Sequence, residues 1–195
     1  MSNNLDEKEI IIVTGLPRSG TSLIMQVLQK IGVPILYDNS KPPDEHNPLG
    51  YFEYEYVKEI PQTSNWKWLK EYQGFGIKII SPILINIPID FPCKIILAVR
   101  NIDEVINSQE KMSGVRKSFY AKEHLKKVYT RHLRLLKEKL QCNKYVKMIE
   151  INYNELLSDP PNILKRLSSF LGKEINIAEV SNVIDYYLYR TRCDN

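Results

Sequence analysis

The sequence predicts an α/β fold of three layers, with a central, mainly parallel sheet of about five strands and helices on both faces. Apolar runs typical of strands alternate along the chain with longer segments of helical periodicity, which is the order found in layered α/β domains. The strand runs are almost continuously apolar, as expected where both faces of a parallel sheet are covered. With 195 residues, of which 43% are hydrophobic, we expect a single domain over residues 1–195.

The elements follow from these patterns in chain order. Strands are expected at residues 9–13, 33–37, 76–80, 94–99 and 147–151. Helices are expected at residues 21–31, 102–112, 119–141, 161–171 and 177–187. The fourth helix has the clearest boundaries, because Ser158 and Asp159 are capping candidates before two prolines and Gly172 suits its end.

A glycine-rich loop joins the first strand to the first helix and reads TGLPRSGTS over residues 14–22. The N–H groups of such a loop and the positive end of the following helix point at one spot, which suits a phosphate. Gly15 and Gly20 match a nucleoside-triphosphate loop, but Thr21 stands at the lysine position and the cation is Arg18. The loop therefore predicts a P-loop-type fold that binds an anion other than the β- and γ-phosphates of ATP with Mg²⁺.

Other polar residues follow later strands, where ligands collect in parallel sheets. Arg100 directly follows the fourth strand, and Ser108 lies eight residues further on, in the next helix. These two side chains could reach one phosphate together. Lys78 lies within the third strand, and Tyr153 follows the fifth. Each residue alone could be an ordinary surface or packing residue. Together with the loop, however, all of them are expected on the same side of the sheet, which indicates a binding site.

This set of motifs resembles the sulfotransferases that use 3′-phosphoadenosine 5′-phosphosulfate (PAPS). Residues 16–22 look like their 5′-phosphosulfate loop, P-[KR]-S-G-T-[ST]. Arg100 and Ser108 match their 3′-phosphate signature, R-x(7)-S. Tyr153 begins a segment similar to Y-E-D/Q-L…P…F-[LV]-G, whose tyrosine lies near the nucleotide. The loop is especially similar to tyrosylprotein sulfotransferases and to small bacterial sulfotransferase-like proteins. The resemblance runs over nearly the whole chain.

The resemblance implies transfer of a sulfuryl group from PAPS to a hydroxyl or amine acceptor by in-line displacement, with no metal required. Adenosine 3′,5′-bisphosphate is the product. Arg18, with help from Lys78, would stabilise charge on the departing bridging oxygen. The residues implied in nucleotide binding are Pro17, Arg18, Ser19, Gly20, Thr21, Ser22, Arg100, Ser108 and Tyr153.

The chain departs from the family pattern at the catalytic base. Cytosolic sulfotransferases carry a histidine in a K-T-H-x-P-like segment, whereas Ile80 stands at that position here. In tyrosylprotein sulfotransferases the base is a glutamate shortly after the second strand. Glu53 is the matching candidate, at the end of the segment DEHNPLGYFE (residues 44–53), and Glu45 and His46 are alternatives. The C-terminal R-K-G nucleotide segment is also missing, and Arg190 and Arg192 are candidates to replace it.

Partners are less defined than the donor. The acceptor could be a small molecule, a carbohydrate or a peptide, and residues 41–72, rich in tyrosine and proline, are expected to form part of its pocket.

The basic segment 111–147 is interpreted as a solvated helix face and not as a nucleic-acid surface. No apolar run is long enough to cross a membrane. A polar N-terminus and three widely spaced cysteines favour the cytoplasm. The oligomeric state stays open.

Two other functions stay open at this point. A P-loop kinase acting on a small molecule or nucleotide fits the loop position, although the loop lysine is missing and Arg100 occupies the best place for a Walker-B aspartate. A non-catalytic nucleotide-binding protein on the same scaffold fits the loss of the histidine.

Overall fold

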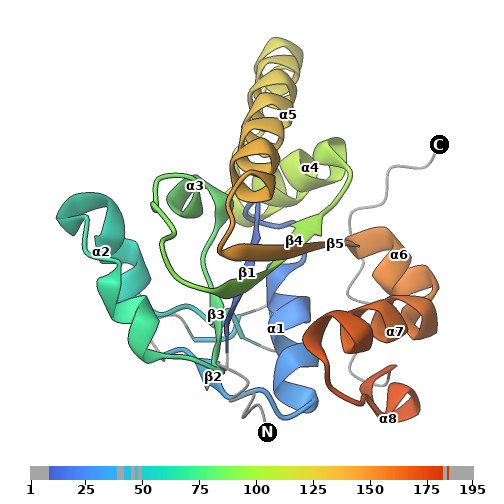
Figure 1. Cartoon of the computed structure of the whole chain (residues 1–195). Helices are drawn as coiled ribbons and strands as arrows, with labels where there is room; N and C mark the ends of the chain where they lie inside the picture. Colours follow the sequence, from blue (N-terminus) through green and yellow to red (C-terminus); the bar gives the residue numbers. More distant parts are fainter. Residues whose placement is uncertain (1–8, 39–41, 45–46, 48–49, 182–183, 185–195) are drawn as a thin grey trace, which may run out of the picture.

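The computed structural model describes residues 9–38, 42–44, 47, 50–181 and 184. Five strands form one sheet in the order β2-β3-β1-β4-β5, and every neighbouring pair is parallel. The strands are β1 (Ile10–Gly15), β2 (Ile35–Leu36), β3 (Gly76–Lys78), β4 (Cys93–Val99) and β5 (Val146–Asn152). Helices cover both faces (Figure 1). The predicted three-layer α/β fold with a five-stranded parallel sheet is confirmed.

The helices include all five that the sequence predicts and four short ones that it does not. The predicted ones are α1 (Thr21–Lys30), α4 (Ile102–Ser113), α5 (Phe119–Gln141), α7 (Pro160–Leu171) and α8 (Ile177–Ser181). The last was expected to reach residue 187, and most of that extension lies outside the described residues. The unpredicted ones are α2 (Glu55–Thr63), the 3₁₀ helix η1 (Lys67–Glu71), α3 (Ser81–Leu84) and α6 (Tyr153–Ser158). Three of these helices are too short to show a clear helical period of apolar residues. The fourth, α2, contains an internal proline, which is atypical of a helix.

The core lies in two layers because successive strand residues point to opposite faces of the sheet. Ile11 and Val13 of β1 pack against α1 and α7 in one cluster. Ile10 and Ile12 pack in the other cluster, with residues of α2, η1, α3 and α5. Both faces of β1 are therefore apolar, which explains why its sequence shows no alternation.

The structure moves an end of three predicted strands by two residues, and the other strand ends lie within one residue of the prediction. Thr14 and Gly15, expected in the loop, extend β1 because they pair with Leu97 and Ala98 of β4. The second strand, expected over five residues, is reduced to an edge pair against β3. The third strand was expected to reach residue 80 but ends at Lys78, since α3 begins at Ser81.

The strand order changes direction at β1. The chain adds β2 and β3 on one side of β1 and then β4 and β5 on the other. In open parallel sheets the crevice at such a switch point, beyond the carboxyl ends of the strands, is the usual ligand site. The loop after β1 and the residues after β4 lie at this place. Across the described ranges, the helices are too short or too polar to traverse a bilayer.

Candidate functional site

The loop after β1 is packed so closely that two of its positions require glycine. A Cβ atom on Gly15 would lie 2.6 Å from the main-chain oxygen of Ala98 in β4. Gly20 has a φ of +98° and leaves no room for a side chain beside the ring of Tyr153. The loop is therefore fixed between the end of β4 and the start of α6.

Helix α1 begins with an uncovered positive end. Gly20 is its N-cap residue and offers no side-chain hydrogen bond, and no acidic residue lies in the first turn. By contrast, α4, α6 and α7 are capped by side chains, of Asn101, Asn152 and Asp159 respectively. The buried Oγ of Ser19, just before this end, has no hydrogen-bond partner in the described part of the chain. Unsatisfied N–H groups, a helix dipole and an unused hydroxyl together suit an anion.

Helix α4 binds the loop directly. Nε of Arg18 donates to Oγ of Ser108 at 3.0 Å, although the two residues are 90 positions apart. Arg100 donates from a terminal guanidinium nitrogen to the main-chain oxygen of Arg18 at 3.2 Å. Gln109 donates to the main-chain oxygen of Pro17 at 3.0 Å. The structure thus brings together the loop and the Arg100–Ser108 pair that the sequence predicts, and Ser108 contacts Arg18.

Arg100 is buried and held on several sides. Its Nε lies 2.9 Å from Oε2 of Glu104, and the two side chains are only 6% and 4% exposed. Asn154 donates to Oε1 of the same carboxylate at 3.2 Å. The guanidinium carbon stands 4.5 Å from the centre of the Tyr153 ring, a cation–π contact. Burial raises the pKa of Tyr153, although Arg100 and Arg18 oppose this shift, so the hydroxyl stays protonated near neutral pH.

Glu104 and Gln109 are site residues that the sequence analysis missed. Glu104 was detectable in part, because it follows Arg100 by four residues, the spacing of an ion pair along a helix. Gln109 had no such signal, since it directly follows Ser108 and its partner is a main-chain oxygen in a distant loop.

A second group of polar residues lies around Lys78 at the end of β3. Nζ of Lys78 donates to the main-chain oxygen of Tyr51 and stands 3.8 Å from Oε1 of Glu53. The Lys78 side chain is 6% exposed, whereas Glu53 is 25% exposed and also meets Lys58 at 3.3 Å. Glu53 therefore presents a partly accessible carboxylate beside a buried ammonium group.

The main-chain oxygen of Tyr51 joins the two groups. It accepts from Lys78 and also from Oγ of Ser22, at 3.4 Å, in the first turn of α1. Asn47 donates to the same Ser22 hydroxyl at 3.2 Å. The Tyr51 hydroxyl lies 2.8 and 2.7 Å from the two carboxylate oxygens of Asp44. Burial, followed by the contact with Asp44, raises the pKa of Tyr51 to about 12.

Several predicted residues cannot be placed in this arrangement. Glu45, His46, Arg190 and Arg192 lie outside the described residues. Four aromatic residues of segment 41–72 contact one another in the ring pairs Tyr54–Tyr56, Tyr54–Trp68, Tyr56–Trp68 and Trp68–Tyr72. Among described residues, no cluster of three or more histidine, cysteine or acidic side chains could hold a metal ion.

Comparison with known proteins gives a consistent family and fold. The model of the sulfotransferase domain family matches residues 8–192. Mouse sulfotransferase SULT7A1 complexed with PAP is similar in structure, with a TM-score of 0.58 at 20% identity over 95% of this chain and 67% of that one. The sulfotransferase domain of the Synechococcus PCC 7002 olefin synthase gives 0.57 at 15% identity, over 100% and 84%. Retinol dehydratase with androsterone and inactive cofactor PAP gives 0.55 at 14% identity, over 92% and 65%. No curated protein matches the sequence.

We expect Glu104→Ala to lower the free energy of unfolding by about 3 kcal/mol, because it leaves the buried Arg100 without its carboxylate. The matched control is Asp103→Ala. It removes the neighbouring pair with Lys126, whose side chains are 43% and 44% exposed, and should cost less than about 1 kcal/mol. Urea unfolding measures both values. Equal losses in the two variants would contradict the role given to Glu104.

The raised pKa of Tyr51 predicts a pH dependence of stability. As the pH rises from 10 towards 12, the unfolded chain loses this proton before the folded one does. The free energy of unfolding should therefore fall in this window, by at most about 1.4 kcal/mol per pH unit from this residue. Tyr51→Phe should remove that share of the slope. Parallel pH profiles of the two proteins in urea unfolding would refute the assignment.

Proposed function

The chain belongs to the sulfotransferase domain family, and we propose that it moves a sulfuryl group from PAPS to a hydroxyl or amine acceptor by in-line displacement. The observation that carries this proposal is the contact of Arg18 with both Ser108 and Arg100. PAPS is anionic at both ends of its nucleotide, so it needs two anion-binding groups close together. The PAP present in the structures of the mouse sulfotransferase and of retinol dehydratase supports the same donor class.

The proposed donor contacts follow from the chemistry of the residues. Main-chain N–H groups after Gly15 and the hydroxyls of Ser19, Thr21 and Ser22 would hold the 5′ end, together with Pro17 and Arg18. The buried Oγ of Ser19, which has no partner among the described residues, and the start of α1, which lacks a side-chain cap, support this fit. Arg100 and Ser108 would hold the 3′-phosphate, since an arginine fork suits a phosphate better than a point charge does. Gly20 and Tyr153 would border the nucleotide.

When bound, PAPS would supply an activated sulfuryl group. Arg18 and Lys78 would stabilise the negative charge that forms on the bridging oxygen. The sulfuryl group carries less charge than a γ-phosphoryl group, so neutralisation by a metal is not required. Glu53 would take the proton of the acceptor, a task that fits its accessible carboxylate next to Lys78. Glu45 and His46 are the alternatives for this role.

A small molecule with a hydroxyl group is the acceptor class that we favour. The retinol dehydratase structure contains androsterone, which is such a molecule. A carbohydrate or a peptide stays possible, with residues 41–72 as the proposed contact region. We further propose a cytoplasmic location, because the widely spaced cysteines favour a reducing compartment.

Titration with adenosine 3′,5′-bisphosphate tests the donor site. Arg100→Ala should weaken binding by about 100-fold, since a charged hydrogen bond contributes about 1.5–3 kcal/mol. Arg166→Ala, which removes a half-exposed arginine of α7, is the matched control and should bind like the parent protein. No bisphosphate binding, combined with stabilisation by ATP and Mg²⁺, would instead favour a kinase.

Glu53→Gln tests the proposed base. Transfer to a panel of hydroxyl and amine acceptors should slow by about 10²–10⁴, while the affinity for the bisphosphate stays unchanged. Glu55→Gln is the matched control, because Glu55 also contacts Lys58 but is 54% exposed and meets no site lysine in the described structure. An unchanged rate in Glu53→Gln would exclude Glu53 and shift the role to Glu45 or His46.

A further inference from the structure

The exposed apolar side chains of this chain are concentrated in one place. Of the nine large apolar residues most exposed in the described structure, six lie between residues 112 and 135. The most exposed are Val115, Phe119 and Tyr120, at 62%, 72% and 84%. They belong to the link between α4 and α5 and to the first turn of α5. Figure 1 shows this end of α5 standing away from the rest of the molecule.

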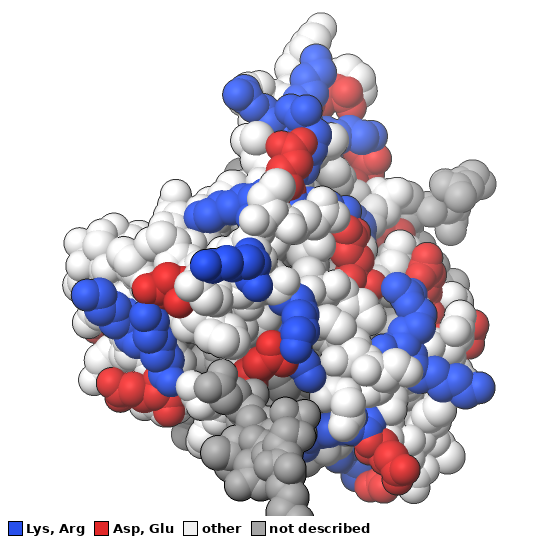
Figure 2. Space-filling model, in the orientation of Figure 1, with Lys and Arg blue, Asp and Glu red and all other residues white. Residues whose placement is uncertain are grey.

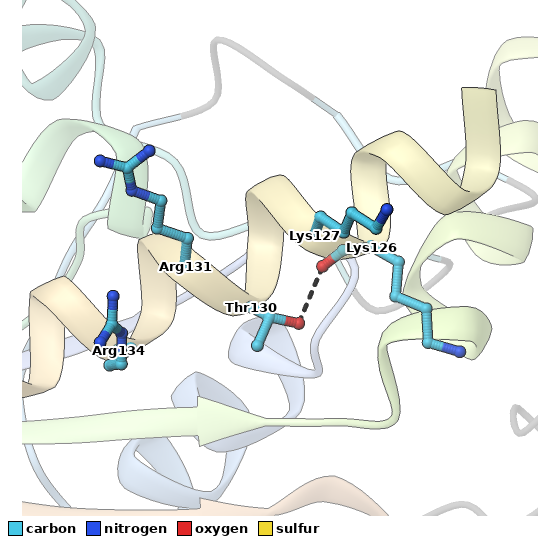
Figure 3. Close-up of a pocket in the computed structure, with 5 residues that line it drawn as sticks. All are labelled: Lys126, Lys127, Thr130, Arg131 and Arg134. Carbon is cyan, nitrogen blue, oxygen red and sulfur yellow. Dashed lines mark hydrogen bonds between the residues drawn. The ribbon is translucent and has the colours of Figure 1, made fainter. Parts of the chain in front are cut away.

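The outer face of α5 also carries three exposed cations for which no ion pair occurs among the described residues, although Glu123 and Glu138 lie four residues from the first and the last of them. Lys127, Arg131 and Arg134 follow each other at intervals of four and three residues, which places them on one side of the helix. With Lys126 and Thr130 they line a shallow hollow of about 370 Å³ (Figure 3). The ion pairs of α5 within the described chain are made by Lys122, Lys126 and Lys137.

The two features are adjacent. Figure 2 shows Lys and Arg side chains, together with some Asp and Glu side chains, around the projecting part of the molecule and uncharged atoms at its end. We propose that this projecting part, which we define as residues 112–135 and which runs from the end of α4 through the link into α5, docks on an anionic lipid membrane. Phe119 and Tyr120 enter the headgroup region, and Lys127, Arg131 and Arg134 contact lipid phosphates or carboxylates.

The charge and the exposed apolar side chains of this surface favour a lipid membrane over a second copy of the chain or a nucleic acid. A second copy of the chain would bring like-charged arginines and lysines together, which is unfavourable. A nucleic acid would use the cations but would leave Val115 and Phe119 exposed to water. A bilayer surface satisfies both kinds of side chain at once, because its headgroups bind the cations while its interface accepts aromatic rings.

Vesicle sedimentation of the full chain tests the proposal. We expect binding to vesicles of phosphatidylcholine mixed with phosphatidylserine and little binding to phosphatidylcholine alone. The triple variant Lys127→Gln, Arg131→Gln, Arg134→Gln should lose about 100-fold in partition, from roughly fivefold per cation. The double variant Phe119→Ala, Tyr120→Ala should lose about tenfold. Bisphosphate binding reports correct folding, since none of these residues lies in the nucleotide site.

A variant with the same loss of charge serves as the control. Lys67→Gln, Lys165→Gln, Lys173→Gln removes three exposed lysines outside residues 112–135 and should keep its vesicle binding. Equal loss in both triple variants would overturn the proposal, because net charge alone would then explain it. Equal binding to neutral and anionic vesicles would overturn it as well. Retention of a DNA duplex or of polyglutamate without any vesicle binding would assign the surface to another class of partner.

Discussion

A buried guanidinium group is the constraint around which the candidate site is arranged. Arg100 is almost fully removed from water, and an isolated charge in that position would be very unfavourable. The carboxylate of Glu104, the ring of Tyr153 and the main-chain oxygen of Arg18 each compensate part of this cost. These partners come from α4, α6 and the loop after β1. Their need to surround one charge fixes the three segments relative to one another.

The parallel sheet makes this arrangement possible. Because β1 and β4 are neighbours with matched register up to Gly15 and Ala98, the segments that follow them start at the same edge. Loop and helix then meet although 90 residues separate Arg18 from Ser108. The start of α1, which has no side-chain cap, belongs to the same arrangement because it directly follows this loop. Helices α4 and α6, which begin beside Arg100, have their own capping side chains, whereas α1 leaves its positive end available to a ligand.

The two halves of the site are linked through main-chain atoms. The oxygen of Tyr51 accepts from Ser22 on the proposed donor side and from Lys78 on the proposed acceptor side. A movement of the segment around Tyr51 would therefore shift both the start of α1, which follows the loop, and the surroundings of the proposed base Glu53. Helix α5 has a comparable double role. Its inner face contributes Leu136 and Leu140 to the core, and its outer face carries the charges proposed to meet a membrane.

The fold class, the five strands, the longer helices and the position of the glycine-rich loop could be predicted from the sequence. These features are local or periodic, so they can be read from apolar runs, glycine spacing and capping residues. Arg100 and Ser108 were also identifiable, because their spacing forms a motif. Three contacts became visible only in the folded chain: Ser108 accepts from Arg18, Gln109 donates to the loop, and the Tyr51 carbonyl accepts from both Ser22 and Lys78. Such contacts connect residues far apart in the chain, often through main-chain oxygens, which every residue possesses and no sequence pattern marks.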